Sequence, residues 1–127
     1  MTRVDHVALE VADLDARLAL LTGPLGMTVQ RRGTLRSDPS RRVVMLGDGT
    51  GFKLELVDSA DGHDRLGHVA WHVDDVVGAH DDLLAAGCAP VRPPAEFAPA
   101  RSTTATVTDP GGLAVQLVRY EPDSPDR

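Results

Sequence analysis

Alternation of hydrophobic and polar residues near the N-terminus predicts a strand. In VDHVALEV, residues 4–11, apolar side chains recur at every second position from Val7 onward, as is typical of a strand with one buried face. Asp13 follows as a candidate helix N-cap, and LDARLALL at 14–21 then places apolar residues at helical spacing. The pattern therefore predicts a strand followed by a capped helix.

The same order recurs later in the chain. GHVAWHV at 67–73 aligns with the first strand at an offset of 62 residues, Asp75 repeats the cap, and VVGAHDDLLAAG at 76–87 repeats the helix. Gly87 is a candidate helix stop. DGTGFKLELV at 48–57 likewise aligns with DPGGLAVQLV at 109–118, at an offset of 61 residues. Two segments with matching beginnings and ends predict two similar modules.

Three further strand candidates lie in each half between these landmarks. They are MTVQRRGTL, RRVVML and FKLELV in the first half, and APVRPP, STTATVT and LAVQLV in the second. GDGTG and DPGG are turn sequences, and the prolines of APVRPP suit an edge strand. The predicted class is α+β, with paired βαβββ modules forming a curved mixed sheet around a metal or ligand cleft. We expect one domain over residues 1–120, modules at about 3–58 and 66–120, and a polar tail over 121–127 that frays.

Composition narrows the function classes. The chain has 127 residues and a net charge of −6, with only short arginine pairs and 3% aromatic residues, which argues against a nucleic-acid partner. It contains no apolar run of transmembrane length and does not begin like a signal peptide, so we expect no membrane partner and a cytoplasmic location. Cys88 is the only cysteine, which excludes a disulfide framework and a Cys-based zinc site. A small-molecule ligand is the expected partner.

Strand alternation sorts the side chains of the first and last strands of each module into two faces. The apolar face should meet the helix, and it consists of Val7, Leu9, Val11, Phe52, Leu54 and Leu56 in one module, and of Val69, Trp71, Val73, Leu113, Val115 and Leu117 in the other. The opposite face holds four polar residues at repeat-equivalent positions: His6 matches His68, and Glu55 matches Gln116.

Two imidazoles, a carboxylate and an amide oxygen form a workable shell for a divalent ion such as nickel, cobalt, zinc, manganese or iron. The alternative is that both histidines are hydrogen-bonded structural residues. Glu10 and His72 are also repeat-equivalent and lie on the same face, so they are candidates for proton transfer, or else solvated groups at the cleft mouth. We expect His63 and His80 at the surface.

In its motifs and their order, the chain resembles the vicinal oxygen chelate superfamily. That superfamily includes glyoxalase I, methylmalonyl-CoA epimerase, extradiol dioxygenases, and fosfomycin- and bleomycin-resistance proteins. DHVALEV, PLGM, FKLELV, GHVAWHV and DPGGLAVQLV carry the resemblance, which spans residues 3–120. It implies paired βαβββ modules, and metal ligands on the first and last strand of each module. These positions are His6, Glu55, His68 and Gln116.

The chain departs from the patterns of the named activities. Glyoxalase I-like members have a glutamate that also serves as catalytic base at the position of Gln116. Epimerase-like members resemble His, Gln, His, Glu in chain order, and this chain reads His, Glu, His, Gln, which is the same set with the modules exchanged. The usual aromatic pair of the first helix is replaced by Leu20 and Leu21.

Two functions remain open from the sequence. The first is a metal-dependent lyase or isomerase of the glyoxalase or epimerase type, with Glu55, Glu10 or His72 moving the proton. The second is a small-molecule (antibiotic) sequestering protein of the bleomycin-resistance type. The connection at 58–65 is short for folding one module over the other, so we also expect a homodimer.

Overall fold

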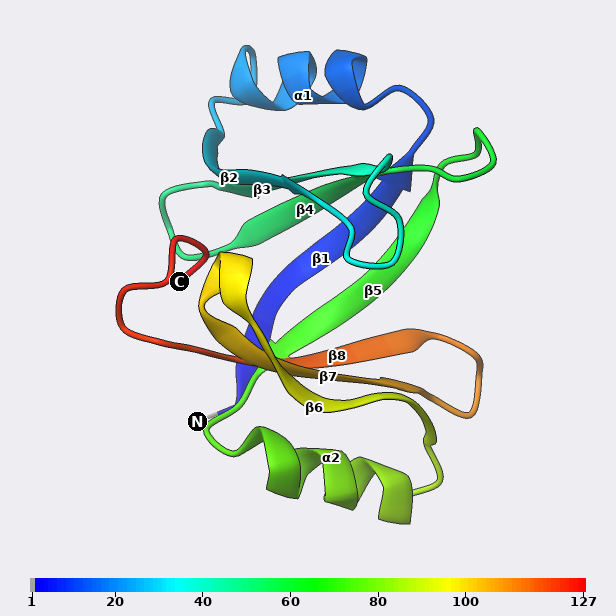
Figure 1. Ribbon diagram of the computed structural model, residues 1–127. Coiled ribbons are helices and arrows are strands. Elements are labelled where there is room, and N and C mark those ends of the chain that lie inside the picture. Colours follow the sequence, from blue (N-terminus) through cyan, green and yellow to red (C-terminus); the bar gives the residue numbers. More distant parts are fainter. Residues whose placement is uncertain (1) are drawn as a thin grey trace. The chain divides into compact units, whose positions relative to one another are not determined.

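A computed structural model describes residues 2–127. Its elements in chain order are β1 (Arg3–Val11), α1 (Leu14–Thr22), β2 (Thr28–Thr34), β3 (Arg42–Gly47), β4 (Lys53–Asp58), β5 (Arg65–His72), α2 (Val76–Ala85), β6 (Ala89–Phe97), the 3-10 helix η1 (Ala98–Ala100), β7 (Ser102–Thr108) and β8 (Ala114–Tyr120). The eight strands form one sheet in the order β2-β3-β4-β1-β5-β8-β7-β6. The prediction of a mixed sheet built from two βαβββ repeats is confirmed (Figure 1).

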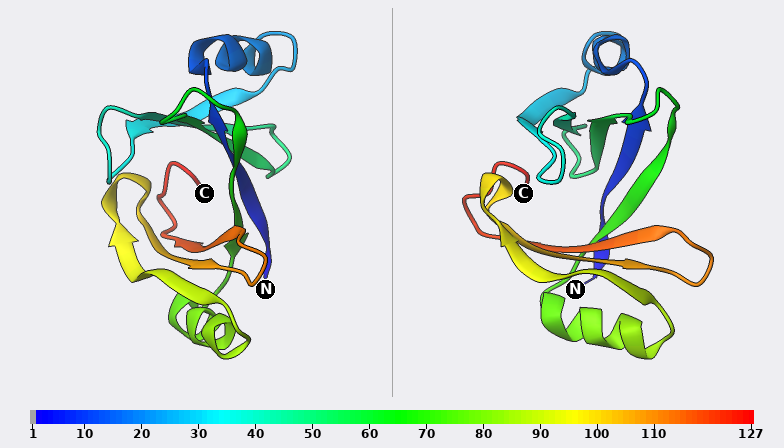
Figure 2. Two further views of the ribbon diagram at one scale, coloured as in Figure 1. Left: turned by 90° about the vertical axis from the view of Figure 1, so that its right-hand side faces the viewer. Right: turned by 45° about the vertical axis from the view of Figure 1, so that its right-hand side comes forward.

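The described residues form two compact units: residues 6–67, called here the first unit, and residues 2–5 with 68–127, the second unit. In the first unit β1 and β4 run parallel, and β4, β3 and β2 follow one another antiparallel. Helix α1 covers one side of these strands (Figure 2). The buried core of the first unit consists of Val11, Leu14, Leu18, Leu21, Val44, Leu46 and Leu56, with Leu9, Met27, Val29 and Leu54 packed against it.

The second unit repeats this arrangement. Strands β5 and β8 are parallel, and β8, β7 and β6 are antiparallel neighbours. Helix α2 packs on β7, β6 and β8. The buried core consists of Val73, Val76, Ala105 and Leu117, with Ala79 and Leu83 against it. Residues that alternation assigns to the helix-facing side therefore lie in both cores: Leu9, Val11, Leu54 and Leu56 in the first unit, and Val73 and Leu117 in the second.

The predicted helix boundaries are confirmed. The side chain of Asp13 accepts a hydrogen bond from the Ala16 amide at 3.0 Å, and that of Asp75 accepts one from the Gly78 amide at 3.0 Å. Each bond satisfies one of the free N–H groups at a helix start. After α2, Gly87 adopts φ +105°, a left-handed conformation that glycine reaches without steric cost and that ends the helix.

Three apolar residues that the pattern assigned to the helix-facing side are exposed instead. Phe52 (43% exposed) and Leu113 (57%) lie in the hairpin turns immediately before β4 and β8. Trp71 (37%) lies on β5, and α2 packs mainly on β6, β7 and β8. A period-two pattern assigns a side chain to a face, but the length and position of the helix decide how much of that face is covered.

The C-terminal segment 121–127 is not frayed, contrary to the prediction. Arg101 binds the carboxylate of Asp123 at 2.6 Å. The Ser124 hydroxyl donates a hydrogen bond to the Ala100 carbonyl. The amide of Glu121 donates one to the Arg101 carbonyl at 2.9 Å. Asp126 is 2% exposed. Specific hydrogen bonds thus hold a segment whose composition alone favours mobility.

Strand β6, with its three prolines, is an edge strand, as predicted. Within residues 2–127, neither helix reaches the length and apolar character that crossing a bilayer requires.

Candidate metal centre

His6 and Glu55 lie on adjacent parallel strands of the first unit. Register pairs Ala8 of β1 with Glu55 of β4, so Glu55 stands diagonally across from His6, two residues further along the strands. Residues at i and i+2 share a face in a strand, so both side chains project away from α1. His6 is 2% exposed.

His68 and Gln116 have the corresponding relationship in the second unit. Register pairs Ala70 of β5 with Gln116 of β8, again in parallel and again two residues beyond the histidine. His68 is half-buried and directly follows Gly67. The strand register therefore reproduces, residue for residue, the repeat that the sequence shows.

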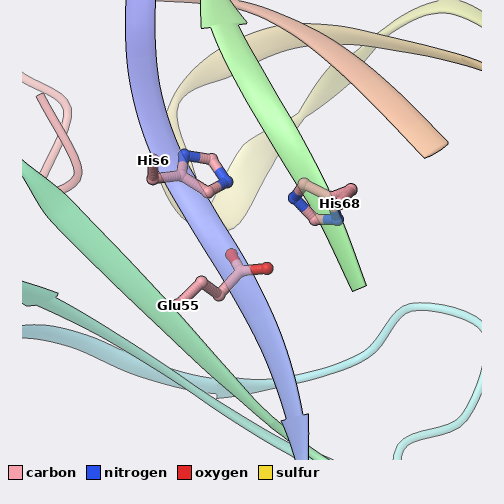
Figure 3. A group of neighbouring side chains, drawn as sticks. All are labelled: His6, Glu55 and His68. Atoms are coloured by element: carbon pink, nitrogen blue, oxygen red, sulfur yellow. The ribbon is translucent and has the colours of Figure 1, made fainter. Parts of the chain in front are cut away.

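Three of the four predicted ligands come together. A ring nitrogen of His6, a ring nitrogen of His68 and a carboxylate oxygen of Glu55 all lie within 4.8 Å of one another. Figure 3 shows the two rings and the carboxylate turned toward one another. Two ligands at about 2.1 Å from a common ion stand at most about 4.2 Å apart, so a small side-chain adjustment allows all three to bind one ion. The donor set suits a divalent transition metal.

Glu10, a candidate for proton transfer, is held by two arginines. Its Oε1 lies 2.9 Å from Nη2 of Arg41 and 3.6 Å from Nη1 of Arg65. Arg41 is itself anchored, because its Nε donates to the Asp58 carbonyl at 2.8 Å. Glu10 does not belong to the His6, Glu55 and His68 group. Its carboxylate instead connects the end of β1 to the residue before β3 and to the start of β5.

His72 lies beside Tyr120 at the end of β8. The two ring centroids are 6.3 Å apart with the planes tilted by 36°. Tyr120 in turn donates its hydroxyl proton to Oδ2 of Asp5 at 2.6 Å. No sequence pattern predicts this connection, because Asp5 and Tyr120 are 115 residues apart. The one signal in the sequence is that Asp5 directly precedes His6.

The remaining histidines differ from one another. His63 is exposed, as expected. His80 is only 7% exposed, so its placement at the surface is wrong. It follows Val76 by one helical turn, on the side of α2 that packs against the strands. Its Nε2 is buried and has no hydrogen-bond partner among residues 2–127.

Comparison with known proteins identifies the family of the chain. The chain matches the Glyoxalase/Bleomycin resistance protein/Dioxygenase superfamily over residues 3–117, and it belongs to that superfamily. It is 29% identical over 125 residues to a probable lactoylglutathione lyase of Vibrio cholerae serotype O1, covering 92% of this chain and 90% of the relative. The chain is thus of the vicinal oxygen chelate type, and this relative is named as a probable lyase.

Solved structures show the same fold. A methylmalonyl-CoA epimerase from Mycobacterium tuberculosis superposes with a TM-score of 0.77 at 23% identity, covering 94% of this chain and 88% of that one. A hypothetical protein from Bacillus halodurans C-125 gives a TM-score of 0.79 at 17% identity, covering 97% of each chain. At these identities the likeness establishes the fold alone.

Proposed function

We propose that this protein is a divalent-metal-dependent isomerase or lyase that acts on a small substrate with two neighbouring oxygens. The observation that supports this most directly is the convergence of His6, Glu55 and His68, whose ligand atoms lie within 4.8 Å of one another. Two imidazoles and a carboxylate, contributed by the first and last strands of the repeat, are a donor set that suits a divalent transition metal.

His6, Glu55 and His68 would hold the metal, with the amide oxygen of Gln116 as the fourth ligand. Superfamily membership and the mixed nitrogen and oxygen donors fit nickel, cobalt, zinc, manganese or iron. Such an ion, when bound, acts as a Lewis acid that polarises a substrate oxygen and makes a neighbouring C–H bond more acidic.

Side chains of the protein would transfer the proton. Glu55 would accept a proton from a substrate carbon only if its carboxylate left the metal. His72 lies on the same strand face as His68 and can return or accept a proton at a ring nitrogen. Glu10 is the weaker candidate, because Arg41 and Arg65 already bind its carboxylate.

Metal binding is the first test. Protein purified without chelator and then loaded with nickel, cobalt, zinc or manganese should contain close to one ion per chain by elemental analysis, and Glu55→Ala should lose most of it. Glu121→Ala is the matched control, because this carboxylate lies outside the group and pairs with Arg119. Absence of bound metal in the loaded protein would contradict the proposal.

Substrate assays distinguish glyoxalase activity from epimerase activity. The names of the relatives suggest the hemithioacetal of methylglyoxal and glutathione, and the two epimers of methylmalonyl-CoA. Because an amide has no usable basic site, Gln116 should make glyoxalase turnover about 10²–10⁴-fold slower than a carboxylate would. Efficient glyoxalase turnover by the unmodified protein would show that Glu55 or another residue is the base.

The sequestering function of the bleomycin-resistance type is the alternative, and that name also appears in the description of the superfamily. Tight calorimetric binding of an antibiotic, together with no turnover of either substrate by metal-loaded protein, would establish it.

A further inference from the structure

A buried hydrogen bond lies next to the metal-centre residue His6. The Tyr120 hydroxyl donates to Oδ2 of Asp5 at 2.6 Å, and Asp5 is 1% exposed. A bond this short between a hydroxyl and a carboxyl oxygen is among the stronger side-chain interactions in proteins. It connects the last residue of β8 to the residue that immediately precedes His6.

The position of Asp5 makes this bond relevant to His6. The register of β1 with β4 begins at His6, so this ladder with β4 does not hold Asp5. Asp5 lies within β1, whose other neighbour is β5. The side-chain bond of Asp5 therefore adds a restraint on the backbone that leads into His6, and on the direction of the His6 Cα–Cβ bond. Metal ligands need positions held to within about 0.5 Å and 10–20°.

The repeat-equivalent of Asp5 has no side chain that could make this hydrogen bond. The counterpart of Asp5, directly before His68, is Gly67. A Cβ at Gly67 would lie 3.2 Å from the carbonyl oxygen of Ala8, a contact tight enough that a side chain there would require the neighbouring backbone to shift slightly. In keeping with this difference, His6 is 2% exposed whereas His68 is half-buried.

We propose that Tyr120 is a positioning residue for the metal centre and acts on His6 through Asp5. This inference rests on the proposed metal function and extends it, because it assigns the preorganisation of one ligand to a residue that touches neither metal nor substrate. His6 is then the fixed ligand of the centre, and His68 is the ligand that adjusts when the ion binds.

Tyr120→Phe is the sharpest test, since it removes the hydroxyl and keeps the ring that lies 6.3 Å from His72. We expect about 10-fold weaker binding of Co²⁺, at the lower end of the effect of losing a hydrogen bond that orients a ligand, and a changed Co²⁺ absorption spectrum. Asp5→Asn keeps an oxygen that can accept the Tyr120 proton, so its Co²⁺ affinity should remain closer to that of the unmodified protein.

Ser124→Ala is the matched control, because it also removes a hydroxyl that hydrogen-bonds within the second unit, here to the Ala100 carbonyl. Its Co²⁺ affinity and spectrum should not change. Circular dichroism and urea titrations on every variant separate folding from metal binding. If folded Tyr120→Phe binds Co²⁺ with unchanged affinity and spectrum, or loses only stability, the inference is wrong. If the unmodified protein binds no Co²⁺, the proposed function itself fails.

Discussion

Gln116 is the residue at which the charge of the proposed centre is set. With Glu55 as the one carboxylate among the four expected ligands, the shell has a single negative charge. Gln116→Glu adds a second at nearly constant volume, and affinity for hard divalent ions rises with the ligand charge count. We expect Mn²⁺ to bind about 10-fold more tightly by calorimetry.

Gln30→Glu on β2 makes the same chemical change at the only other glutamine of the chain. It should leave Mn²⁺ affinity unchanged, so an equal gain in both variants would point to net charge rather than to ligation.

Burial of His80 is expected to lower the stability of the fold. Its side chain is 7% exposed and its Nε2 has no hydrogen-bond partner, so folding removes this atom from water without compensation. Leaving a buried polar atom unpaired costs about 1–3 kcal/mol. His80→Leu should therefore raise the free energy of unfolding by about 1 kcal/mol in urea titrations, whereas His63→Leu at an exposed site should change it by less than about 0.5 kcal/mol. A loss of stability in His80→Leu would mean that the ring has a partner which stabilises the fold.

At the scale of elements, the two helices begin in the same way. Asp13 and Asp75 each accept a hydrogen bond from the third residue after them, so each caps its helix with its side chain. Asp75→Ala should lower the free energy of unfolding by about 1 kcal/mol, because the Gly78 amide loses its acceptor.

Asp81→Ala, at an exposed position inside α2, is the comparison for that experiment. Alanine is the better helix former, so this variant should be unchanged or slightly more stable. Equal destabilisation by both substitutions would show that capping is not the cause.

At the scale of the whole molecule, paired carboxylates make stability depend on pH. Hydrogen bonds from the Arg42 side chain lower the pKa of Asp58, and those from Arg65 and Ser59 lower the pKa of Asp61. A carboxylate whose folded pKa is depressed contributes stability above its unfolded pKa of about 3.9, and this contribution is lost as pH falls through the folded value.

We therefore expect the free energy of unfolding to decrease steadily below about pH 4 in urea titrations. Arg42→Met removes the group that depresses the pKa of Asp58, so its stability should depend less steeply on pH in this range. An identical slope in the two proteins would refute the assignment. The homodimer stays a prediction, and light scattering at micromolar concentration tests it.

The elements and the candidate ligands follow from the amino-acid pattern alone. Alternation, helical spacing, the two aspartate caps and Gly87 are local signals, and local signals specify strands, helices and their ends. The repeat added long-range information, because it placed His6 with His68 and Glu55 with Gln116 on matching strands before any pairing was known. Parallel registers of β1 with β4 and of β5 with β8 follow the same correspondence.

Only the tertiary structure decided which polar groups meet. Glu10 lies 31 residues from Arg41, and Asp5 lies 115 residues from Tyr120, so no periodicity predicts either pair. The burial of His80 depends on where α2 lies over its strands, which its own sequence does not state. Periodicity assigns a side chain to a face, whereas a hydrogen bond or an ion pair requires two side chains to arrive at one place, and that is fixed by the packing of the whole chain.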